Sequence, residues 1–271
     1  MKRPRILTIA GSDSGGGAGI QADLKTIAAH RCYGMSAITA MTAQNTRGVH
    51  AVLDASPAFI ESQLDAVLED IGCDAAKTGM LSREESIRAV AASLSRHQVP
   101  NLVVDPVMVS KSGHRLLAGD AIDALVTALV PLARLITPNL HEVEELTGRL
   151  PGNVEEMEEA ARELAEFGAG AVLVKGGHLP GEQAVDVLWD GTKMQRLESE
   201  RVDCPHTHGT GCTLSAAIAC GLARGEDIGV AVKSAKVYLV KAMKAAYPVG
   251  GGIGPVNHLW EFESGAATTS E

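Results

Sequence analysis

Short apolar runs alternate with longer amphipathic segments along most of the chain. The apolar runs predict buried strands at 5–10, 34–43, 74–81, 101–108, 134–139 and 169–174. Helical spacing of apolar side chains predicts helices at 20–31, 57–71, 82–97, 118–132, 140–146, 154–167, 211–224 and 228–247. This alternation favours an α/β fold: a doubly wound, mostly parallel central sheet flanked by helices in three layers.

Local signals refine these boundaries. Ser56 before Pro57 predicts a helix N-cap, and Ser82 with Glu85 predicts a capping box. Segments 185–189 and 194–202 predict a hairpin around Asp190-Gly191. No linker or internal repeat interrupts the pattern, so we expect one domain over 1–262. The Ser/Ala/Thr/Gly-rich tail at 263–271 is expected to be disordered.

Composition narrows the function classes. The 271 residues, 45% of them hydrophobic, suffice for one large α/β domain. A net charge of −9 argues against a general nucleic-acid binder, and 3% aromatic residues argue against single-strand stacking. The five cysteines are dispersed without a CxxC pair, as in proteins with reduced thiols. Without a signal-like or membrane-spanning segment, we expect a cytoplasmic protein with no membrane partner.

The stretch 208–213, His-Gly-Thr-Gly-Cys-Thr, is the strongest candidate for chemistry. It precedes a small-residue helix, and a glycine-containing helix start directs free N–H groups and the positive dipole end at one spot. Gly209 and Gly211 allow close approach of an oxyanion to the backbone. Cys212 would lie in the first turn, where a thiol pKa can fall from about 8.5 toward neutrality. The alternative is a helix start with packing glycines and a buried cysteine.

Polar side chains follow several of the expected strands. Gln44, Asp105, Asn139 and Lys175 stand at strand ends, which in a doubly wound sheet gather along one edge. A turn at Gln44 and a helix cap at Asp105 are the alternatives. The glycines at 11–19 follow the first strand, yet their spacing does not match G-x-G-x-x-G, so they indicate a dinucleotide site only weakly.

Several longer motifs together resemble one family. Residues 10–26, AGSDSGGGAGIQADLKT, look like the opening of the hydroxymethylpyrimidine (phosphate) kinases of thiamin biosynthesis, in the ribokinase-like superfamily. Similar motifs follow in the same order at 42–46, 77–81, 105–108, 137–142, 175–178, 206–213 and 254–256. The resemblance covers about residues 5 to 260.

This resemblance implies ATP-dependent phosphorylation of 4-amino-5-hydroxymethyl-2-methylpyrimidine and then of its monophosphate. Cys212 matches the catalytic base, and Gly209, Thr210 and Gly211 match the anion hole. Gln44 matches the residue that binds the pyrimidine, and the rest of that pocket is matched by Gly11, Asp23, Met80 and Val107. The Mg-ATP region is matched by Asp105, Asn139 and Glu142, with Lys175 near the nucleotide. Asp105 and Glu142 would hold Mg²⁺, a cation that prefers oxygen ligands. A homodimer is expected, and the need for a monovalent cation stays open.

Other functions compete with this interpretation. A pyridoxal kinase of the same branch shares the glycine-cysteine loop, although the Gln44 amide, which donates and accepts, favours an aminopyrimidine. A non-catalytic pyrimidine-binding domain predicts loss of Asp105, Glu142 or Cys212, and all three are present. A thiol hydrolase would pair Cys212 with His206 or His208, but would leave Asp105, Asn139 and Glu142 without a role. As a metal pair, His206 and His208 lack further ligands.

Overall fold

The computed structural model describes residues 3–109, 113, 116–117, 119 and 121–263. A nine-stranded sheet forms its centre, with the strand order β3-β2-β1-β4-β5-β6-β7-β8-β9. The strands are β1 (Arg5–Asp13), β2 (Tyr33–Asn45), β3 (Gly48–Asp54), β4 (Ala75–Thr78), β5 (Leu102–Val104), β6 (Leu135–Ile136), β7 (Val172–Val174), β8 (Gln183–Trp189) and β9 (Met194–Glu200). Pairing is parallel from β2 through β7, whereas β3, β8 and β9 are antiparallel. The doubly wound, mostly parallel sheet is thereby confirmed.

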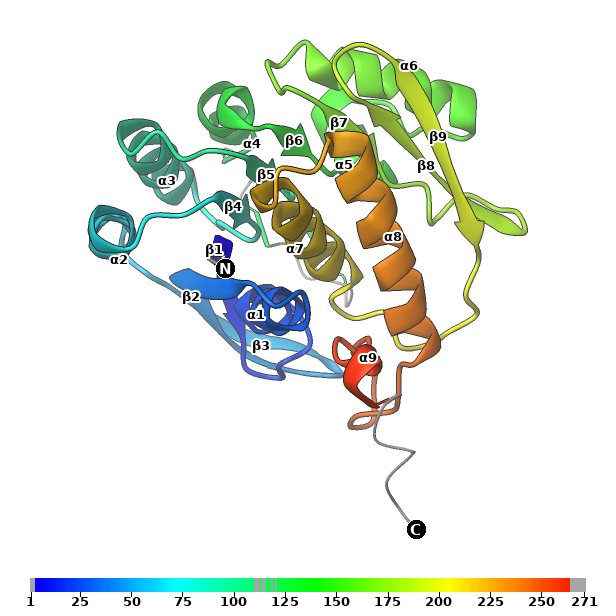
Figure 1. Cartoon of the computed structure of the whole chain (residues 1–271), viewed down its shortest axis with the longest axis horizontal. Coiled ribbons are helices and arrows are strands. Elements are labelled where there is room, and N and C mark those ends of the chain that lie inside the picture. Colours follow the sequence, from blue (N-terminus) through cyan, green and yellow to red (C-terminus); the bar gives the residue numbers. More distant parts are fainter. Residues whose placement is uncertain (1–2, 110–112, 114–115, 118, 120, 264–271) are drawn as a thin grey trace.

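Helices cover both faces of the sheet (Figure 1). One face carries α2 (Pro57–Asp70), α3 (Glu84–Arg96), α4 (Ala121–Ala124), α5 (Leu140–Thr147) and α6 (Val154–Ala165). The other face carries α1 (Gly19–Ala29), α7 (Thr210–Ala223) and α8 (Ile228–Lys244), with the short α9 (Trp260–Glu263) nearby. The molecule therefore has the three expected layers.

Side-chain alternation along the strands produces two cores. On β5, Leu102 and Val104 face the core beneath α2–α6, while Val103 faces the core beneath α1, α7 and α8. On β1, Leu7 and Ile6 divide in the same way. Successive side chains of a strand point to opposite faces, so a strand covered on both sides must be apolar throughout. This explains the continuous apolar runs in the sequence.

The same alternation directs polar side chains toward α7. Asp105, Thr137 and Lys175 each stand two positions after a residue of the α7-side core, namely Val103, Leu135 and Leu173. Residues two apart on an extended chain share a face. The carboxyl ends of three neighbouring strands therefore deliver their polar side chains to the end of α7.

Two strands differ from expectation. β1 does not end at Ala10 but continues to Asp13, with a register shift against β2 between Ala10 and Ser12. Gly11 thus lies at an irregularity within β1 and not after the strand. β3 was not expected, because most of its side chains are exposed and its sequence shows no alternation of apolar and polar residues.

Two helix predictions were wrong in detail. The capping box at Ser82 does not form: α3 begins at Glu84 after Arg83, and Ser82 has a φ of +61°. The segment 118–132 is α-helical only at Ala121–Ala124 within the described residues, and continues as a π-helical turn, η1 (Leu125–Leu129), and a 3₁₀ turn, η2 (Val130–Leu132). Pro131 lacks the N–H that a regular α-helix would need there, which accounts for the change in helix type.

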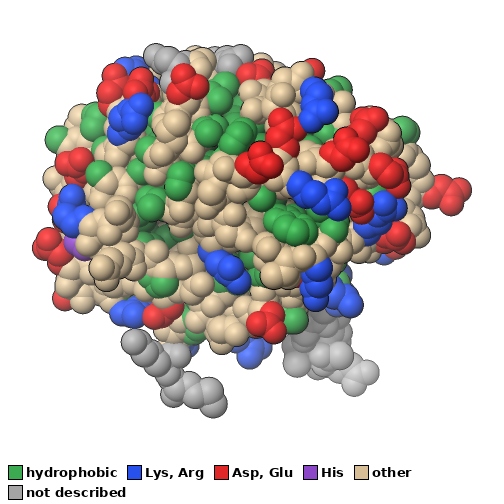
Figure 2. Space-filling view, turned by 90° about the horizontal axis from the view of Figure 1, so that it is seen from above, with side chains coloured by type: hydrophobic (Ala, Val, Ile, Leu, Met, Phe, Trp, Pro, Cys, Tyr) green, Lys and Arg blue, Asp and Glu red, His purple; other side chains and the backbone are tan. Residues whose placement is uncertain are grey.

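Charged side chains are not spread evenly over the surface. Acidic side chains gather over the end of the molecule where α6 lies, with lysines and arginines among them (Figure 2). Helix α6 corresponds to the helix predicted at 154–167, and its buried side is formed by Met157, Ala160, Ala161 and Leu164. No helix among the described residues is both long and apolar enough to cross a membrane. The expected disordered tail lies outside the described residues, except Glu263, which ends α9.

Candidate active site

A cavity of about 860 Å³ runs along the carboxyl edge of the sheet. It brings together nearly all the residues that the sequence singled out: Gly11, Gln44, Met80, Asp105, Val107, Asn139, Glu142, Lys175, Gly209, Thr210, Gly211 and Cys212. Asp23 does not line the cavity. The clustering at strand ends, inferred from the order of polar residues along the chain, is confirmed.

The first turn of α7 forms one wall of this cavity. Gly209 is its N-cap and has a φ of +80°, and a Cβ there would lie 1.9 Å from the carbonyl oxygen of Gly17. A Cβ on Gly211 would lie 3.3 Å from Oδ2 of Asp105 and 3.6 Å from Nζ of Lys175. Only glycine fits the first position. At the second, glycine keeps open the space before the helix N-terminus, where the positive end of the helix dipole can attract an anion.

Cys212 is half-buried in this turn and lines the cavity. Burial raises the pKa of its thiol to about 11; Lys77 lowers it, while Asp23 and Asp105 raise it further. The N–H of Gly19 donates to the sulfur, which also favours the thiolate. The expected fall of the thiol pKa toward neutrality was therefore wrong for the protein alone, because burial and two carboxylates outweigh the helix end.

Asp105 is the centre of a charged network at the end of β5. It is 2% exposed, and its Oδ1 accepts hydrogen bonds from Thr137 Oγ1 at 3.0 Å and from Lys175 Nζ at 2.9 Å. Burial opposes its charge, but the ammonium groups of Lys175 and Lys77 keep the pKa of Asp105 below its ordinary value. Asp105 is therefore an anion beside the helix N-terminus.

Asn139 and Glu142 form the capping box that begins α5. The Asn139 side chain accepts from the N–H of Glu142 at 3.0 Å, and Glu142 Oε2 accepts from the N–H of Asn139 at 2.7 Å. Lys175 Nζ lies 3.8 Å from that same carboxylate oxygen. Both residues thus have a structural role in α5, and both also line the cavity.

Gln44 also lines the cavity, and its neighbours include a residue pair that the sequence did not reveal. Thr42 Oγ1 donates to Gln44 Oε1 at 3.1 Å, and Gln44 Nε2 lies 3.3 Å from His208 Nε2. That imidazole nitrogen lies 2.8 Å from Asp13 Oδ2. Asp13 was not proposed as a site residue, and His208 was considered only for a hydrolase or a metal. The one available signal was an acidic residue at the start of a glycine-rich loop.

Asp23 lies behind the cavity wall instead of in it. Its carboxylate is 0% exposed and lies 3.0 Å from Nζ of Lys77, which is also 0% exposed. Thr8 Oγ1 donates to the same carboxylate at 2.6 Å. This placement does not favour the direct contact between Asp23 and a bound pyrimidine that the resemblance implied.

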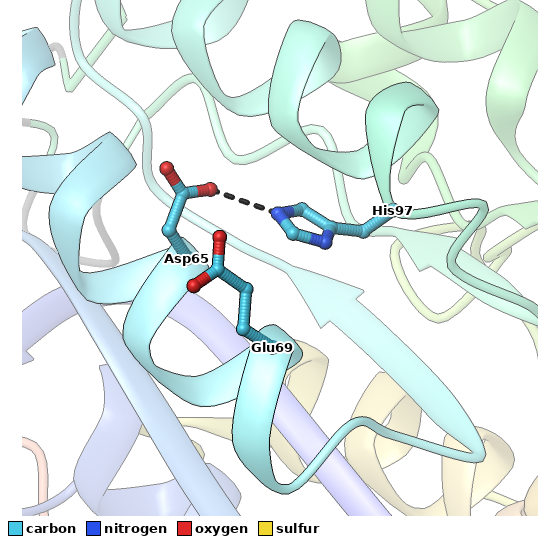
Figure 3. A group of neighbouring side chains, drawn as sticks. All are labelled: Asp65, Glu69 and His97. Atoms are coloured by element: carbon cyan, nitrogen blue, oxygen red, sulfur yellow. Dashed lines mark hydrogen bonds and ion pairs between the residues drawn. The ribbon is translucent and has the colours of Figure 1, made fainter.

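A separate group of metal-type ligands joins α2 to the end of α3. Asp65, Glu69 and His97 offer ligand atoms within 4.8 Å of one another (Figure 3). His97 Nε2 and Arg96 Nη2 both contact Oδ1 of Asp65, at 2.8 and 2.5 Å. Because the Arg96 guanidinium already provides a positive charge at this carboxylate, we interpret the group as a salt bridge between helices.

Comparisons with known proteins agree with this geometry. A family model described as phosphomethylpyrimidine kinase matches residues 13–257. The hydroxymethylpyrimidine/phosphomethylpyrimidine kinase of Streptomyces coelicolor is 51% identical over 257 residues, 95% of each chain. The ADP complex of Bacillus subtilis pyridoxal kinase has a TM-score of 0.89 at 42% identity, covering 95% of this chain and 98% of that chain. The phosphomethylpyrimidine kinase of Clostridium difficile has a TM-score of 0.79 at 48% identity, covering 89% and 99%.

The doubly wound sheet, the cavity at its carboxyl edge and the likeness to these solved kinases define a ribokinase-like phosphotransferase. Within that class the sequence match is specific, since the matched model spans residues 13–257. The chain belongs to the phosphomethylpyrimidine kinase family.

Proposed function

We propose that the protein uses ATP to phosphorylate 4-amino-5-hydroxymethyl-2-methylpyrimidine, and then the monophosphate to the diphosphate, in thiamin biosynthesis. One observation carries this proposal: a single cavity joins Gln44, Asp105 and the first turn of α7. The hydroxymethylpyrimidine/phosphomethylpyrimidine kinase named in Streptomyces coelicolor, at 51% identity, supports the choice of substrate.

The acceptor would lie between Gln44 and Cys212. Gly11, Met80 and Val107 also line the cavity, and apolar or small surfaces of this kind suit a flat heteroaromatic ring. The Gln44 amide can donate to a ring nitrogen and accept from the ring amine. Its oxygen is held by Thr42, so the amide is oriented before the substrate enters.

Cys212 would act as the general base of the first phosphorylation. The thiolate sulfur takes the proton of the hydroxymethyl O–H while that oxygen forms its bond to the γ-phosphorus of ATP, and ADP leaves with the electrons of the broken P–O bond. The thiol then returns its proton to solvent. In the second phosphorylation the acceptor is a phosphate monoester, which is already anionic near neutral pH, so less depends on Cys212.

The transferred phosphoryl group would be held at the start of α7. Gly209, Thr210, Gly211 and Cys212 supply N–H groups to the charge that develops on it. Lys175 would lie beside the phosphates, and Asn139 would support the same region. The carboxylates of Asp105 and Glu142 fit a divalent cation such as Mg²⁺: both line the cavity, and Asp105 Oδ2 faces Gly211 while Oδ1 takes the protein's hydrogen bonds. When bound, this cation neutralises phosphate charge.

The nucleoside of ATP would lie beside α8. Apolar side chains line the cavity there and after β9: Val202, Leu239, Val240 and Met243. The related pyridoxal kinase of Bacillus subtilis is described as an ADP complex, which supports nucleotide binding by this fold.

Pyridoxal phosphorylation is the second candidate. It is favoured by the TM-score of 0.89 to Bacillus subtilis pyridoxal kinase, at 42% identity. Pyridoxal also carries a hydroxymethyl group on a flat ring, so the same base and anion hole would serve. The two substrates differ at the groups that face Gln44.

Formation of ADP by the purified protein, with and without added pyrimidine, tests the proposal. We expect turnover that depends on the pyrimidine and on Mg²⁺. Pyrimidine-independent ATP hydrolysis alone, or none at all, would contradict it. The homodimer, the cytoplasmic location and the effect of a monovalent cation stay predictions; light scattering and a comparison of K⁺ with Na⁺ test the first and the last.

A further inference from the structure

Lys77 and Asp23 form an ion pair that is wholly buried. Both side chains are 0% exposed, and Lys77 Nζ lies 3.0 Å from each Asp23 oxygen. Burying two charges costs several kcal/mol per ion, and apolar side chains of similar volume often serve stability as well or better. Stability alone is therefore a weak explanation for this pair.

The place of Lys77 in the sheet indicates a role at the active site. It pairs in register with Thr8 on β1 and with Val103 on β5, in the middle of the sheet. Ala75, two residues earlier, belongs to the core beneath α7, so the Lys77 side chain lies on the same face. Helix α7 packs directly against β4 and β5. The ammonium group thus lies beneath the helix whose first turn carries Cys212.

Four charged groups influence the charge of the Cys212 sulfur, each from a different part of the chain. Lys77 comes from β4, Asp23 from α1, Asp105 follows β5 and Lys175 follows β7. Lys77 is the strongest of these charges on the sulfur and the one that favours the thiolate, whereas the two carboxylates oppose it. Lys175 is 15% exposed and lies in contact with Asp105, so solvent and that carboxylate reduce its effect.

We propose that Lys77 is a positioning residue whose buried ammonium stabilises negative charge on the Cys212 sulfur, and that the carboxylate of its partner Asp23 opposes that charge and so limits the effect. The catalytic consequence rests on the proposed role of Cys212 as base. The effect of Lys77 on the charge of the sulfur does not rest on that role, because thiolate formation can be measured without catalysis. Asp23 thereby has a role behind the cavity wall, in agreement with its burial.

The test is the pH dependence of Cys212 alkylation by iodoacetamide, followed on the Cys212-containing peptide by mass spectrometry. In Lys77→Met the reaction at about pH 8.5 slows by about tenfold, because less thiolate forms. In Asp23→Asn it speeds up by about threefold or more, because an opposing carboxylate is lost. A purely structural pair predicts changes in the same direction for both variants.

Lys236→Met is the matched control. Lys236 also forms a buried ion pair, 2.6 Å from Asp186, and lines the cavity, but it is not among the groups that shift the pKa of Cys212. Its loss leaves the alkylation rate of Cys212 within about twofold of that of the unmodified protein. If Lys77→Met does not fold, Lys77→Met/Asp23→Asn is compared with Asp23→Asn, since these two differ only in the ammonium group.

The results separate the two proposals. Slower alkylation on loss of Lys77 supports its role, even if Cys212→Ser retains full kinase activity and the base assignment fails. An unchanged alkylation rate on loss of Lys77, or shifts in the same direction for Lys77→Met and Asp23→Asn, overturns the inference, whatever the kinase activity of Cys212 variants.

Discussion

His208 Nε2 lies 2.8 Å from Oδ2 of Asp13, and this contact joins the loop after β1 to the loop before α7. The same Asp13 oxygen accepts from the N–H groups of Gly17 and Ala18 at 3.0 and 2.9 Å. Burial opposes the charge of Asp13, yet the hydrogen bonds from His208 and the backbone keep its pKa below the ordinary value. Two loops that line the cavity, the one after β1 and the one before α7, therefore depend on one carboxylate.

Replacing that carboxylate with an amide loosens both loops. For Asp13→Asn we expect the KM for the pyrimidine to rise about tenfold, and stability at neutral pH to fall by about 2 kcal/mol. Because the folded pKa of Asp13 is depressed, its contribution is present above the unfolded pKa of about 4 and is lost as pH falls through the folded value. Thermal unfolding at about pH 7 and pH 2.5 checks this; an equal difference at both would contradict it.

Alanine substitutions at two glycines of the first turn of α7 should affect different properties: stability at Gly209 and activity at Gly211. Gly209→Ala places a Cβ 1.9 Å from the Gly17 carbonyl oxygen at a φ of +80°, so it should destabilise the fold by about 2 kcal/mol or more. Gly211→Ala should leave the fold intact, because alanine favours a helix by up to about 1 kcal/mol over glycine. Its methyl group would instead fill the space beside Asp105 and Lys175 and lower kcat about a hundredfold or more. Denaturation curves and kinase assays on both variants decide; a fully active Gly211→Ala would argue against the anion hole.

The two phosphorylations should differ in their need for Cys212. Cys212→Ala should lower kcat/KM on the pyrimidine alcohol by about a hundredfold or more, the usual contribution of a general base. On the pyrimidine monophosphate we expect less than about a tenfold loss, since that acceptor is already anionic. Separate kinetics on the two acceptors measure the difference, and equal losses would refute the base role.

The raised thiol pKa makes the first step depend on pH. With the Cys212 pKa at about 11, the thiol predominates near neutral pH, and kcat/KM reports the ionisation of the free enzyme. We expect kcat/KM on the alcohol to rise about tenfold per pH unit between about pH 6.5 and 8.5. In Cys212→Ala that slope should vanish. A flat profile in the unmodified protein would exclude this thiol as the base.

The sequence was sufficient to predict the positions of residues at the ends of strands and at the start of α7. Asp105 and Lys175 directly follow β5 and β7, and the carboxyl ends of parallel strands meet at one edge of a sheet, so their proximity was predictable. Gly209 and Gly211 likewise allowed the helix N-terminus to be predicted from local sequence. These inferences require only local pattern and the topology of the sheet.

Relationships between distant segments escaped sequence analysis. The Asp13–His208 contact spans 195 residues, and no local pattern indicates it. Lys77 sits in a four-residue strand, where nothing in the sequence shows that its charge is buried. The thiol pKa of Cys212 depends on burial and on two carboxylates, one in α1 and one directly after β5, so the helix end alone gave the wrong direction. Ser82 failed as a cap because its backbone adopts a φ of +61°.

The most direct test of the central claim is a kinase assay of the purified protein with Mg-ATP and three acceptors: the hydroxymethylpyrimidine, its monophosphate and pyridoxal. We predict that both pyrimidines are phosphorylated, each with a kcat/KM well above that for pyridoxal. Pyridoxal as the preferred acceptor, or no transfer to either pyrimidine, would contradict the proposed function.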